Sequence, residues 1–136
     1  LENDIDGVKA AVADYTVAEP AAHKVKKRGE ELSLTLVPTV DILATVASLQ
    51  RRPFTVGFAA ETENLESYAR TKLKNKRLDL IAANLVGMSG SGFESDDNDL
   101  SVYWAAGGTA LGKASKQVLA HKLIAVIAER FRGSTA

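Results

Sequence analysis

The chain has 136 residues, 46% of them hydrophobic, which suits a single domain with a buried core. Its 17 basic and 17 acidic side chains cancel, so no overall charge favours nucleic acid as a partner. Cysteine is absent, which excludes disulfides, a thiolate nucleophile and cysteine-based metal sites, and the two histidines fit no zinc spacing. No apolar run has the length of a membrane helix, and the first residues are acidic rather than signal-like. We therefore expect a cytoplasmic protein that does not bind membranes.

Strands and helices are expected to alternate along the first part of the chain. Residues 8–13 are small and apolar, as in a strand that is buried on both faces. Residues 14–30 combine a proline, several alanines and a basic cluster without a clear period, which indicates a loop. An alternation of period two at 32–37 predicts a half-buried strand, and the apolar spacing at 41–49 predicts a short helix.

The middle of the chain predicts a strand, a helix and a second strand. Pro53 precedes a strand over 54–59, and Thr62 is a plausible N-cap for the helix that follows. The acidic side chains of this helix come first and its lysines come last, which matches the helix dipole. Residues 78–83 then form another buried strand.

The last third predicts antiparallel strands and a final helix. Residues 87–99 are rich in turn formers, 100–104 alternate like an antiparallel strand, and Gly107-Gly108 is typical of a hairpin turn. The final helix is expected to begin near Ser115. Its predicted core face holds Val118, Leu119, Lys122, Leu123, Val126 and Ile127. The whole pattern predicts one α/β domain with a Rossmann-like, mostly parallel sheet, helices on both faces and antiparallel additions.

Two segments are typical of a nucleotide site. Residues 57–62 (GFAAET) read as a strand and a small-residue turn with a carboxylate, and they lead through a lysine-bearing helix to the strand at 80–84 (LIAAN). A second strand and turn at 10–15 (AAVADY) leads to the basic loop 24–27 (KVKK). Open α/β sheets bind ligands outside the carboxyl ends of their parallel strands. These segments therefore predict a site for an anionic ligand.

Each candidate residue also has a plain structural interpretation. Asp14 could cap a turn, and the 24–27 cluster could be either solvated surface or a cationic loop that closes over phosphates. Lys72 and Lys76 lie one helical turn apart, so they could bind phosphate or merely complement the helix dipole. Phe58 could belong to the core or cover a nucleobase.

Five motifs occur in the order and spacing of one known family. These are 10–15 (AAVADY), 24–27 (KVKK), 57–62 (GFAAET), 80–84 (LIAAN) and 92–96 (GFESD). Over nearly its whole length the chain resembles phosphopantothenoylcysteine synthetase (phosphopantothenate–cysteine ligase), the ligase domain of the bacterial bifunctional coenzyme A biosynthesis protein.

The resemblance implies a reaction and its participants. The carboxylate of 4'-phosphopantothenate attacks the α-phosphate of CTP to give an acyl-cytidylate and pyrophosphate, and the amine of L-cysteine then displaces CMP. Mg²⁺ is the implied cofactor, and FMN would be needed only if a phosphopantothenoylcysteine decarboxylase domain is fused upstream. The family is also dimeric, and strands that include 31–37 would help to pair its subunits.

The resemblance also assigns site residues. The implied nucleotide-binding positions are Val8, Lys9, Ala10, Asp14, Lys24, Thr39, Val40, Asp41, Ile42, Phe58, Lys72 and Lys76. Lys24 has the implied catalytic role, within a lid over about 16–28 that shields the acyl-nucleotide from water. Thr39-Val40 departs from the usual Asn-Pro of the family, and no residue is assigned to the metal.

The family's first strand, its Gly-rich turn and an Asn-containing segment do not precede Leu1. We therefore expect residues 1–136 to be the C-terminal part of the ligase domain, with an incomplete sheet and site. A non-catalytic nucleotide-binding or dimerisation fragment is the alternative. A nicotinamide oxidoreductase is disfavoured because no G-x-G-x-x-G follows a strand.

Overall fold

The computed structural model describes residues 15–19, 29, 31, 33–87 and 97–134. Its elements in chain order are β1 (Tyr15–Val17), β2 (Leu36–Pro38), α1 (Ile42–Ala47), β3 (Val56–Glu61), α2 (Leu65–Asn75), β4 (Leu80–Leu85), β5 (Asp97–Trp104), β6 (Gly107–Ser115) and α4 (Lys116–Ser134). The strand expected at 8–13 and most of the turn-rich segment expected at 87–99 lie outside the described residues. Two expectations are corrected where the chain is described, because residues 97–99 begin β5 and residues 15–17 of the expected 14–30 loop form β1.

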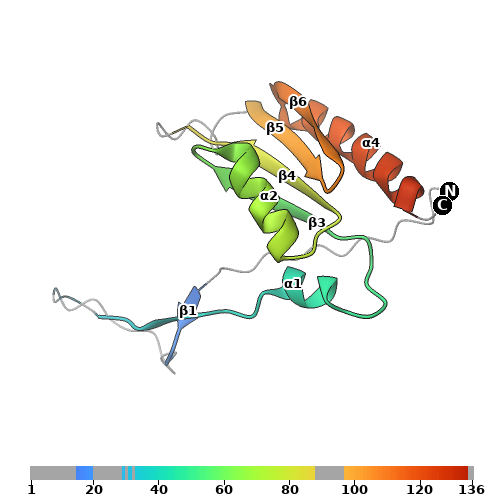
Figure 1. Cartoon of the computed structure of the whole chain (residues 1–136). Coiled ribbons are helices and arrows are strands. Elements are labelled where there is room, and N and C mark those ends of the chain that lie inside the picture. The colour runs from blue at the N-terminus through green and yellow to red at the C-terminus, as the bar shows by residue number, and fades with distance from the viewer. Residues whose placement is uncertain (1–14, 20–28, 30, 32, 88–96, 135–136) are drawn as a thin grey trace.

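Four strands form one sheet in the order β3-β4-β5-β6. β3 and β4 run parallel, in a register that extends from Val56 opposite Leu80 to Glu61 opposite Leu85. β5 pairs antiparallel with both β4 and β6. The expected α/β class and the antiparallel additions are confirmed. Within the described residues the sheet is mixed, with one parallel pairing, and helices cover its two faces (Figure 1).

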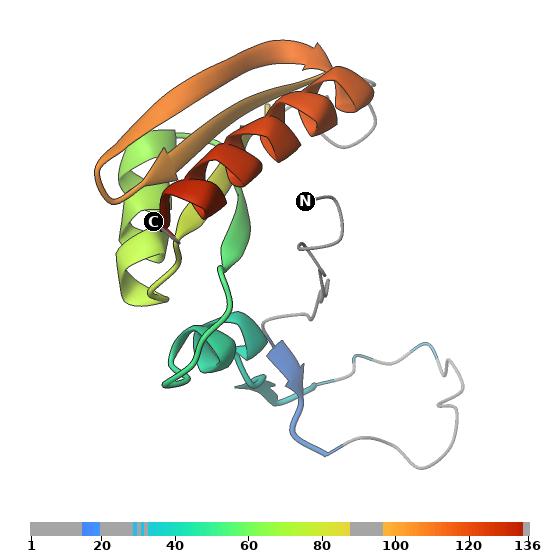
Figure 2. The ribbon, with the colours of Figure 1, turned by 90° about the vertical axis from the view of Figure 1, so that its right-hand side faces the viewer.

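Each face of the sheet has its own buried core. The core under α2 contains Ala59, Ala69, Leu73, Leu78, Ile81 and Ala83. The core under α4 contains Leu80, Ala82, Leu100, Val102, Leu119 and Leu123. Figures 1 and 2 accordingly place α2 and α4 on opposite sides of the sheet. Successive residues of β4 enter the two cores in turn, so both faces of the strand are buried. This is why the sequence of β4 is apolar without interruption.

A glycine in β3 allows close packing on the α2 side. A Cβ atom at Gly57 would lie 2.6 Å from Leu78 Cδ1 and 3.3 Å from Leu43 Cδ2. Leu43 belongs to α1, so the small residue lets this short helix approach the strand. The GFAAET sequence therefore serves the packing of α1 as well as the turn after β3.

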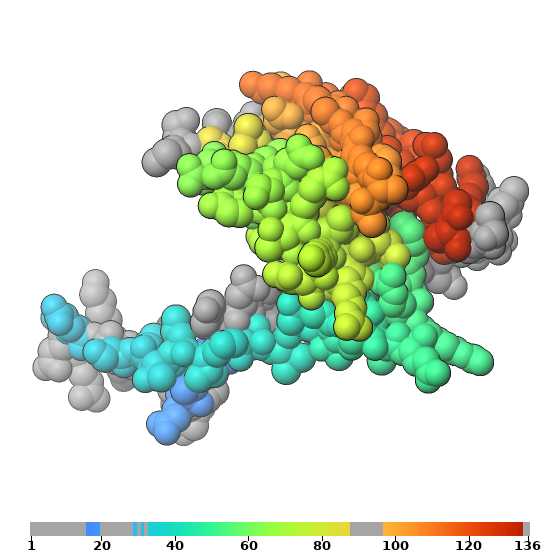
Figure 3. Space-filling view, viewed as in Figure 1, coloured from blue at the N-terminus to red at the C-terminus, as the bar shows by residue number. Residues whose placement is uncertain are grey.

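β1 and β2 form a two-stranded antiparallel ribbon, and we call residues 15–19 and 33–38 the arm. Figure 1 places the arm away from the four-stranded sheet, and in Figure 3 its cyan residues project from the body of the molecule. The half-buried strand expected at 32–37 is corrected, because β2 begins at Leu36 and its residues are exposed. Leu34 and Leu36 are 57% and 56% exposed. In the described part of the chain, no second layer covers the arm, so the alternation of its leucines does not lead to burial.

The N-terminus of α2 differs from the prediction. Its N-cap is Asn64 rather than Thr62, and the Asn64 side chain makes no capping hydrogen bond. The backbone of Asn64 is left-handed, with φ 47°. Asparagine tolerates this conformation, whereas a β-branched threonine is strained in it.

The hairpin turn between β5 and β6 also differs from the prediction. The turn is formed by residues 105–106, while Gly107 and Gly108 pair with β5 inside the ladder. A Cβ atom at Gly108 would lie 2.7 Å from Tyr103 Cδ1. The glycine therefore makes room for an aromatic ring beside the strand instead of forming the turn.

The final helix starts next to Ser115, as expected, but its core face is narrower than predicted. The packed positions are Leu119, Leu123, Val126 and Ile127. Val118 is 45% exposed, and the Lys122 ammonium donates a hydrogen bond to the Leu111 carbonyl at 3.3 Å instead of entering the core. Among the described residues, no helix combines the length and apolar character needed to cross a membrane.

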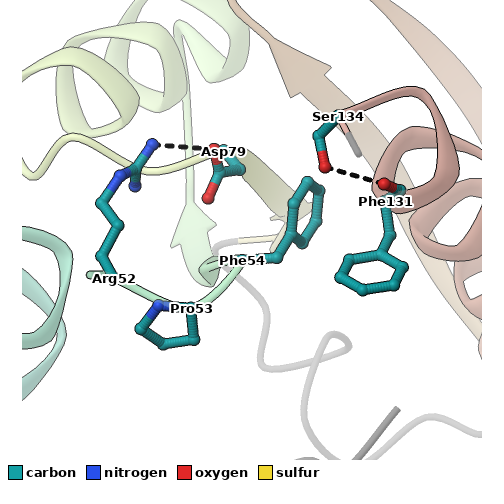
Figure 4. Close-up of a pocket in the computed structure, with 6 residues that line it drawn as sticks. All are labelled: Arg52, Pro53, Phe54, Asp79, Phe131 and Ser134. Carbon is teal, nitrogen blue, oxygen red and sulfur yellow. Dashed lines mark hydrogen bonds and ion pairs between the residues drawn. The ribbon is translucent and has the colours of Figure 1, made fainter. Parts of the chain in front are cut away.

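Asp79 connects the start of β4 to the segment before β3 (Figure 4). One of its carboxylate oxygens accepts hydrogen bonds from the Thr55 N–H at 2.8 Å and the Thr55 hydroxyl at 3.2 Å. The other lies 2.9 Å from the Arg52 guanidinium. A shallow hollow of about 300 Å³ beside this contact is lined by Arg52, Pro53, Phe54, Asp79, Phe131 and Ser134. It lies at the amino ends of the parallel strands, the opposite end of the sheet from the predicted site.

We expect Asp79→Ala to lower the free energy of unfolding by about 2 kcal/mol, because the nearly buried Thr55 N–H loses its partner. Thr55 is only 4% exposed, so water cannot readily replace the carboxylate. Urea denaturation measures the change. Glu66→Ala is the matched control, since it removes an exposed i,i+4 pair with Arg70 and should change stability by less than about 0.5 kcal/mol. Equal effects of the two substitutions would contradict a structural role for Asp79.

Candidate functional site

The candidate site runs along the face of α2 from the carboxyl end of β3 at Glu61 to the C-cap of α2 at Lys76, four residues before the start of β4. Lys72 lies in the last turn of α2, and the ammonium groups of Lys72 and Lys76 each contact a carboxylate from another element. Lys72 Nζ lies 2.6 Å from an oxygen of Glu61, the last residue of β3. Lys76 Nζ lies 3.1 Å from an oxygen of Asp41, just before α1. The helix thus holds two cations between the end of β3 and the start of α1.

Asp41 fixes the local structure at the start of α1. Its side chain accepts a hydrogen bond from the Ala44 N–H at 3.0 Å, which makes it the N-cap of the helix. This hydrogen bond, together with the nearby Lys76 ammonium, holds the pKa of Asp41 below its ordinary value despite slight burial. Asp41 is therefore an anion that contacts Lys76, and its assignment to the nucleotide stays a prediction.

The other residues of the predicted 39–42 loop lie beside Asp41. Val40 is 73% exposed, and Ile42, the first residue of α1, is 42% exposed. Thr39 is half-buried. The structure thus brings the 39–42 loop to the end of α2 that carries Lys76.

Phe58 lies on the other face of β3. Gly57 and Ala59 face α2, so the alternation of the strand turns Phe58 toward the α4 side. Because β3 is the edge strand of the described sheet, α4 does not cover this position and Phe58 is 72% exposed. The core interpretation of Phe58 is therefore wrong, and its ring is accessible. The structure does not place the ring on the same face as the two lysines.

Several predicted site residues lie outside the described part of the chain. They are Val8, Lys9, Ala10, Asp14 and Lys24, the last within the predicted lid. Their assignments stay predictions.

Two further polar residues lie at the carboxyl ends of the strands. Glu61 partners Lys72, and its position directly after the small-residue strand is the sequence signal that could have identified it. Asn84, near the end of β4, has a buried side-chain oxygen that finds no hydrogen-bond partner among the residues the structure describes. Asn84 lies opposite Ala60 in the register, on the same face as Phe58. Only the pairing of the strands reveals this position.

Magnesium would find few protein ligands in the described residues. They contain no group of three His, Cys, Asp or Glu side chains that could hold a metal ion. The two carboxylates nearest the site, on Asp41 and Glu61, already contact lysines. The described residues therefore do not fit a resident metal site, and what they offer is a pair of cations for an anionic ligand.

Comparison with known proteins identifies the family. The model of the DNA/pantothenate metabolism flavoprotein C-terminal domain matches residues 2–131. This chain belongs to that family. The resemblance drawn from the five motifs is therefore confirmed.

The similar curated proteins share the name coenzyme A biosynthesis bifunctional protein CoaBC. The chain is 47% identical over 126 residues to the protein of Vibrio vulnificus (strain CMCP6), an alignment that covers 90% of this chain and 31% of that protein. It is 48% identical over 124 residues to the Haemophilus influenzae protein, with the same two shares. For the Escherichia coli (strain K12) protein the identity is 46% over 126 residues. The chain thus spans 31% of the length of these relatives.

Solved structures agree with this assignment. The C-terminal domain of a coenzyme A biosynthesis bifunctional protein CoaBC superposes with a TM-score of 0.67 and 29% identity, over 91% of this chain and 53% of that one. A DNA/pantothenate metabolism flavoprotein from Streptococcus pneumoniae superposes with a TM-score of 0.63 at 20% identity, over 88% of this chain and 60% of that one. The second similarity supports the fold alone.

Proposed function

We propose that this chain is part of a CTP-dependent phosphopantothenate–cysteine ligase of coenzyme A biosynthesis. The observation that carries the proposal is the pair Lys72 and Lys76, one turn apart at the C-terminal end of α2, with the Lys72 ammonium at the carboxyl end of β3. A nucleoside triphosphate that meets a second phosphorylated substrate brings a large negative charge to this edge. Fixed ammonium groups at the edge of a sheet neutralise such charge. The name of the relatives supports the pathway.

The proposed reaction has two steps. The carboxylate oxygen of 4'-phosphopantothenate attacks the α-phosphorus of CTP, the bond to the bridging oxygen breaks, and pyrophosphate leaves. The amine of L-cysteine then attacks the acyl carbon of the resulting acyl-cytidylate, CMP leaves with the electron pair, and the amine loses a proton. The product is 4'-phosphopantothenoylcysteine.

In this proposal, residues of the chain bind the nucleotide, neutralise the charge of its phosphates and shield the acyl-cytidylate from water. Lys72 and Lys76 contact the phosphates, and the accessible ring of Phe58 covers the base from the edge of β3. Asp14 and the 8–10 segment contribute to the nucleotide site, and Lys24 closes the lid over the intermediate. Mg²⁺ bound to the triphosphate would supply further charge neutralisation, as is usual where protein carboxylates are few.

The arm supports a proposed homodimer. Its exposed leucines, Leu34 and Leu36, lie on a ribbon that nothing covers in the described part of the chain. Exposed apolar side chains gathered on one segment are typical of protein–protein contacts. Sedimentation equilibrium of the full-length protein tests the dimer.

The rest of the protein is also a matter of proposal. Because the relatives are named bifunctional and the chain spans 31% of their length, we propose an upstream decarboxylase domain that would bind FMN. We place the enzyme in the cytoplasm, where the other substrates of the pathway occur.

The test is pyrophosphate release by the full-length protein. We expect release from CTP that requires 4'-phosphopantothenate and magnesium and needs no added flavin. Omission of phosphopantothenate is the control, because it removes the attacking carboxylate.

Equal or better turnover with ATP would overturn the assignment to the CTP-dependent type. CTP binding without pyrophosphate release would favour the alternative, a non-catalytic nucleotide-binding or dimerisation unit. Absence of both CTP binding and pyrophosphate release would reject a nucleotide function.

A further inference from the structure

Glu61 is less exposed than three other carboxylates that contact lysine or arginine, those of Asp79, Asp41 and Glu66. Its side chain is only 15% exposed, against 22%, 43% and 63% for these three. The backbone of Glu61 is fixed too, because it pairs with β4 and its carbonyl accepts a hydrogen bond from the Val86 N–H at 2.9 Å. The carboxylate is therefore held rigidly at the end of β3.

Lys72 is more exposed than Glu61. Its side chain is 45% exposed, and its contact with Glu61 at 2.6 Å joins it to a rigid group on another element. Glu66 and Arg70, by contrast, both lie on α2, so their pair fixes nothing beyond the helix surface. An exposed lysine without such an anchor samples many rotamers, and it loses that freedom when it binds a ligand.

We propose that Glu61 is a positioning residue that holds the Lys72 ammonium at the carboxyl end of the strand pair, ready for phosphate. The inference rests on the proposed nucleotide function. An ammonium group has three N–H donors, so one can serve Glu61 while the others remain available to a phosphate oxygen. Because Glu61 fixes the lysine before the ligand arrives, less side-chain entropy is lost on binding.

The first experiment measures CTP affinity in the full-length protein by calorimetry. We expect Glu61→Gln to weaken CTP binding about three- to tenfold, the factor that corresponds to one immobilised long side chain. The turnover at saturating CTP and the KM values for the other substrates should change by less than about twofold, because this contribution is made in the ground state. In a Lys72→Ala background the same substitution should have no further effect, since Glu61 acts through Lys72.

Glu66→Gln is the matched control, because it neutralises a glutamate on α2 that is far more exposed. It should leave CTP affinity unchanged. Unchanged or tighter CTP binding in Glu61→Gln would overturn the positioning role. An equal loss in the Lys72→Ala background would overturn it as well.

A second measurement separates this inference from the proposed function. In the 136-residue chain with isotope-labelled lysines, NMR should show the Lys72 ammonium more ordered than that of exposed Lys74, and Glu61→Gln should remove the difference. Equal order in the wild type would reject the positioning role even if CTP binds. If the ammonium is ordered but the full-length protein binds no CTP, the nucleotide function fails while the contact with Glu61 stands.

Discussion

Replacement of Lys72 or Lys76 by alanine is expected to weaken CTP binding by about 10- to 100-fold, which is the value of one or two hydrogen bonds to a charged group. Each substitution removes a cation that the proposed function assigns to the phosphates. Lys72→Ala should have the larger effect, because the contact with Glu61 already holds the Lys72 ammonium and less side-chain entropy is lost when it binds phosphate. Calorimetric titration of each full-length variant with CTP measures the change.

Lys74 is the matched control for these two lysines. It lies on the same helix, and it is exposed. Lys74→Ala should change CTP affinity by less than about twofold, since it removes the same charge from a different side of α2. Wild-type affinity in both Lys72→Ala and Lys76→Ala would return these residues to a role in solubility and the helix dipole.

Lys24→Gln is expected to reduce ligation by about 100-fold or more, the usual effect of removing one group that stabilises charge in the transition state. Lys24 heads the proposed lid, and its cation would be drawn to the phosphates of the acyl-cytidylate and close the loop over it. A substitution in a surface loop seldom changes stability by more than about 0.5 kcal/mol, so the melting temperature should hardly change. The two measurements are turnover and thermal melting of the full-length variant.

Lys26→Gln removes the same charge two residues away and is the matched control. Since the family resemblance assigns no ligand contact to Lys26, its turnover should fall by less than about threefold. Unchanged turnover in Lys24→Gln would reject the lid role. A large fall in its melting temperature would instead make Lys24 a structural residue.

The central strand-helix-strand unit could be predicted because its signals are local and strong. The small, apolar residues of β3 and β4 predict buried strands, and the order of the charges along α2 predicts a helix between them. Local propensity and hydrophobic pattern therefore agree on this unit. Two of the errors concern features that depend on how side chains pack in the folded molecule. Gly108 looked like a turn residue because only the structure shows the ring of Tyr103 against it. The leucines of the arm alternate as a buried strand does, yet no layer among the described residues covers them.

The sequence predicted the two lysines of the candidate site, but it did not predict the carboxylates that they contact. Lys72 and Lys76 share a helix face by spacing alone. Their contacts with Glu61 and Asp41 join residues that are 11 and 35 positions apart in the chain, and no sequence period connects these. The exposure of Phe58 likewise depends on which strand forms the edge of the sheet, and that is a property of the assembled topology.

The order of the four-stranded sheet bears on how the molecule folds. Among the described residues, β3, β4 and β5 each pair with the strand that follows them in the chain, so none of these pairings must wait for a distant segment. Short closures lose little chain entropy, and topologies dominated by them fold quickly. None of these strand pairings therefore involves the arm. Substitutions in the arm that alter its binding to a partner or ligand should consequently have little effect on the rate at which the sheet forms.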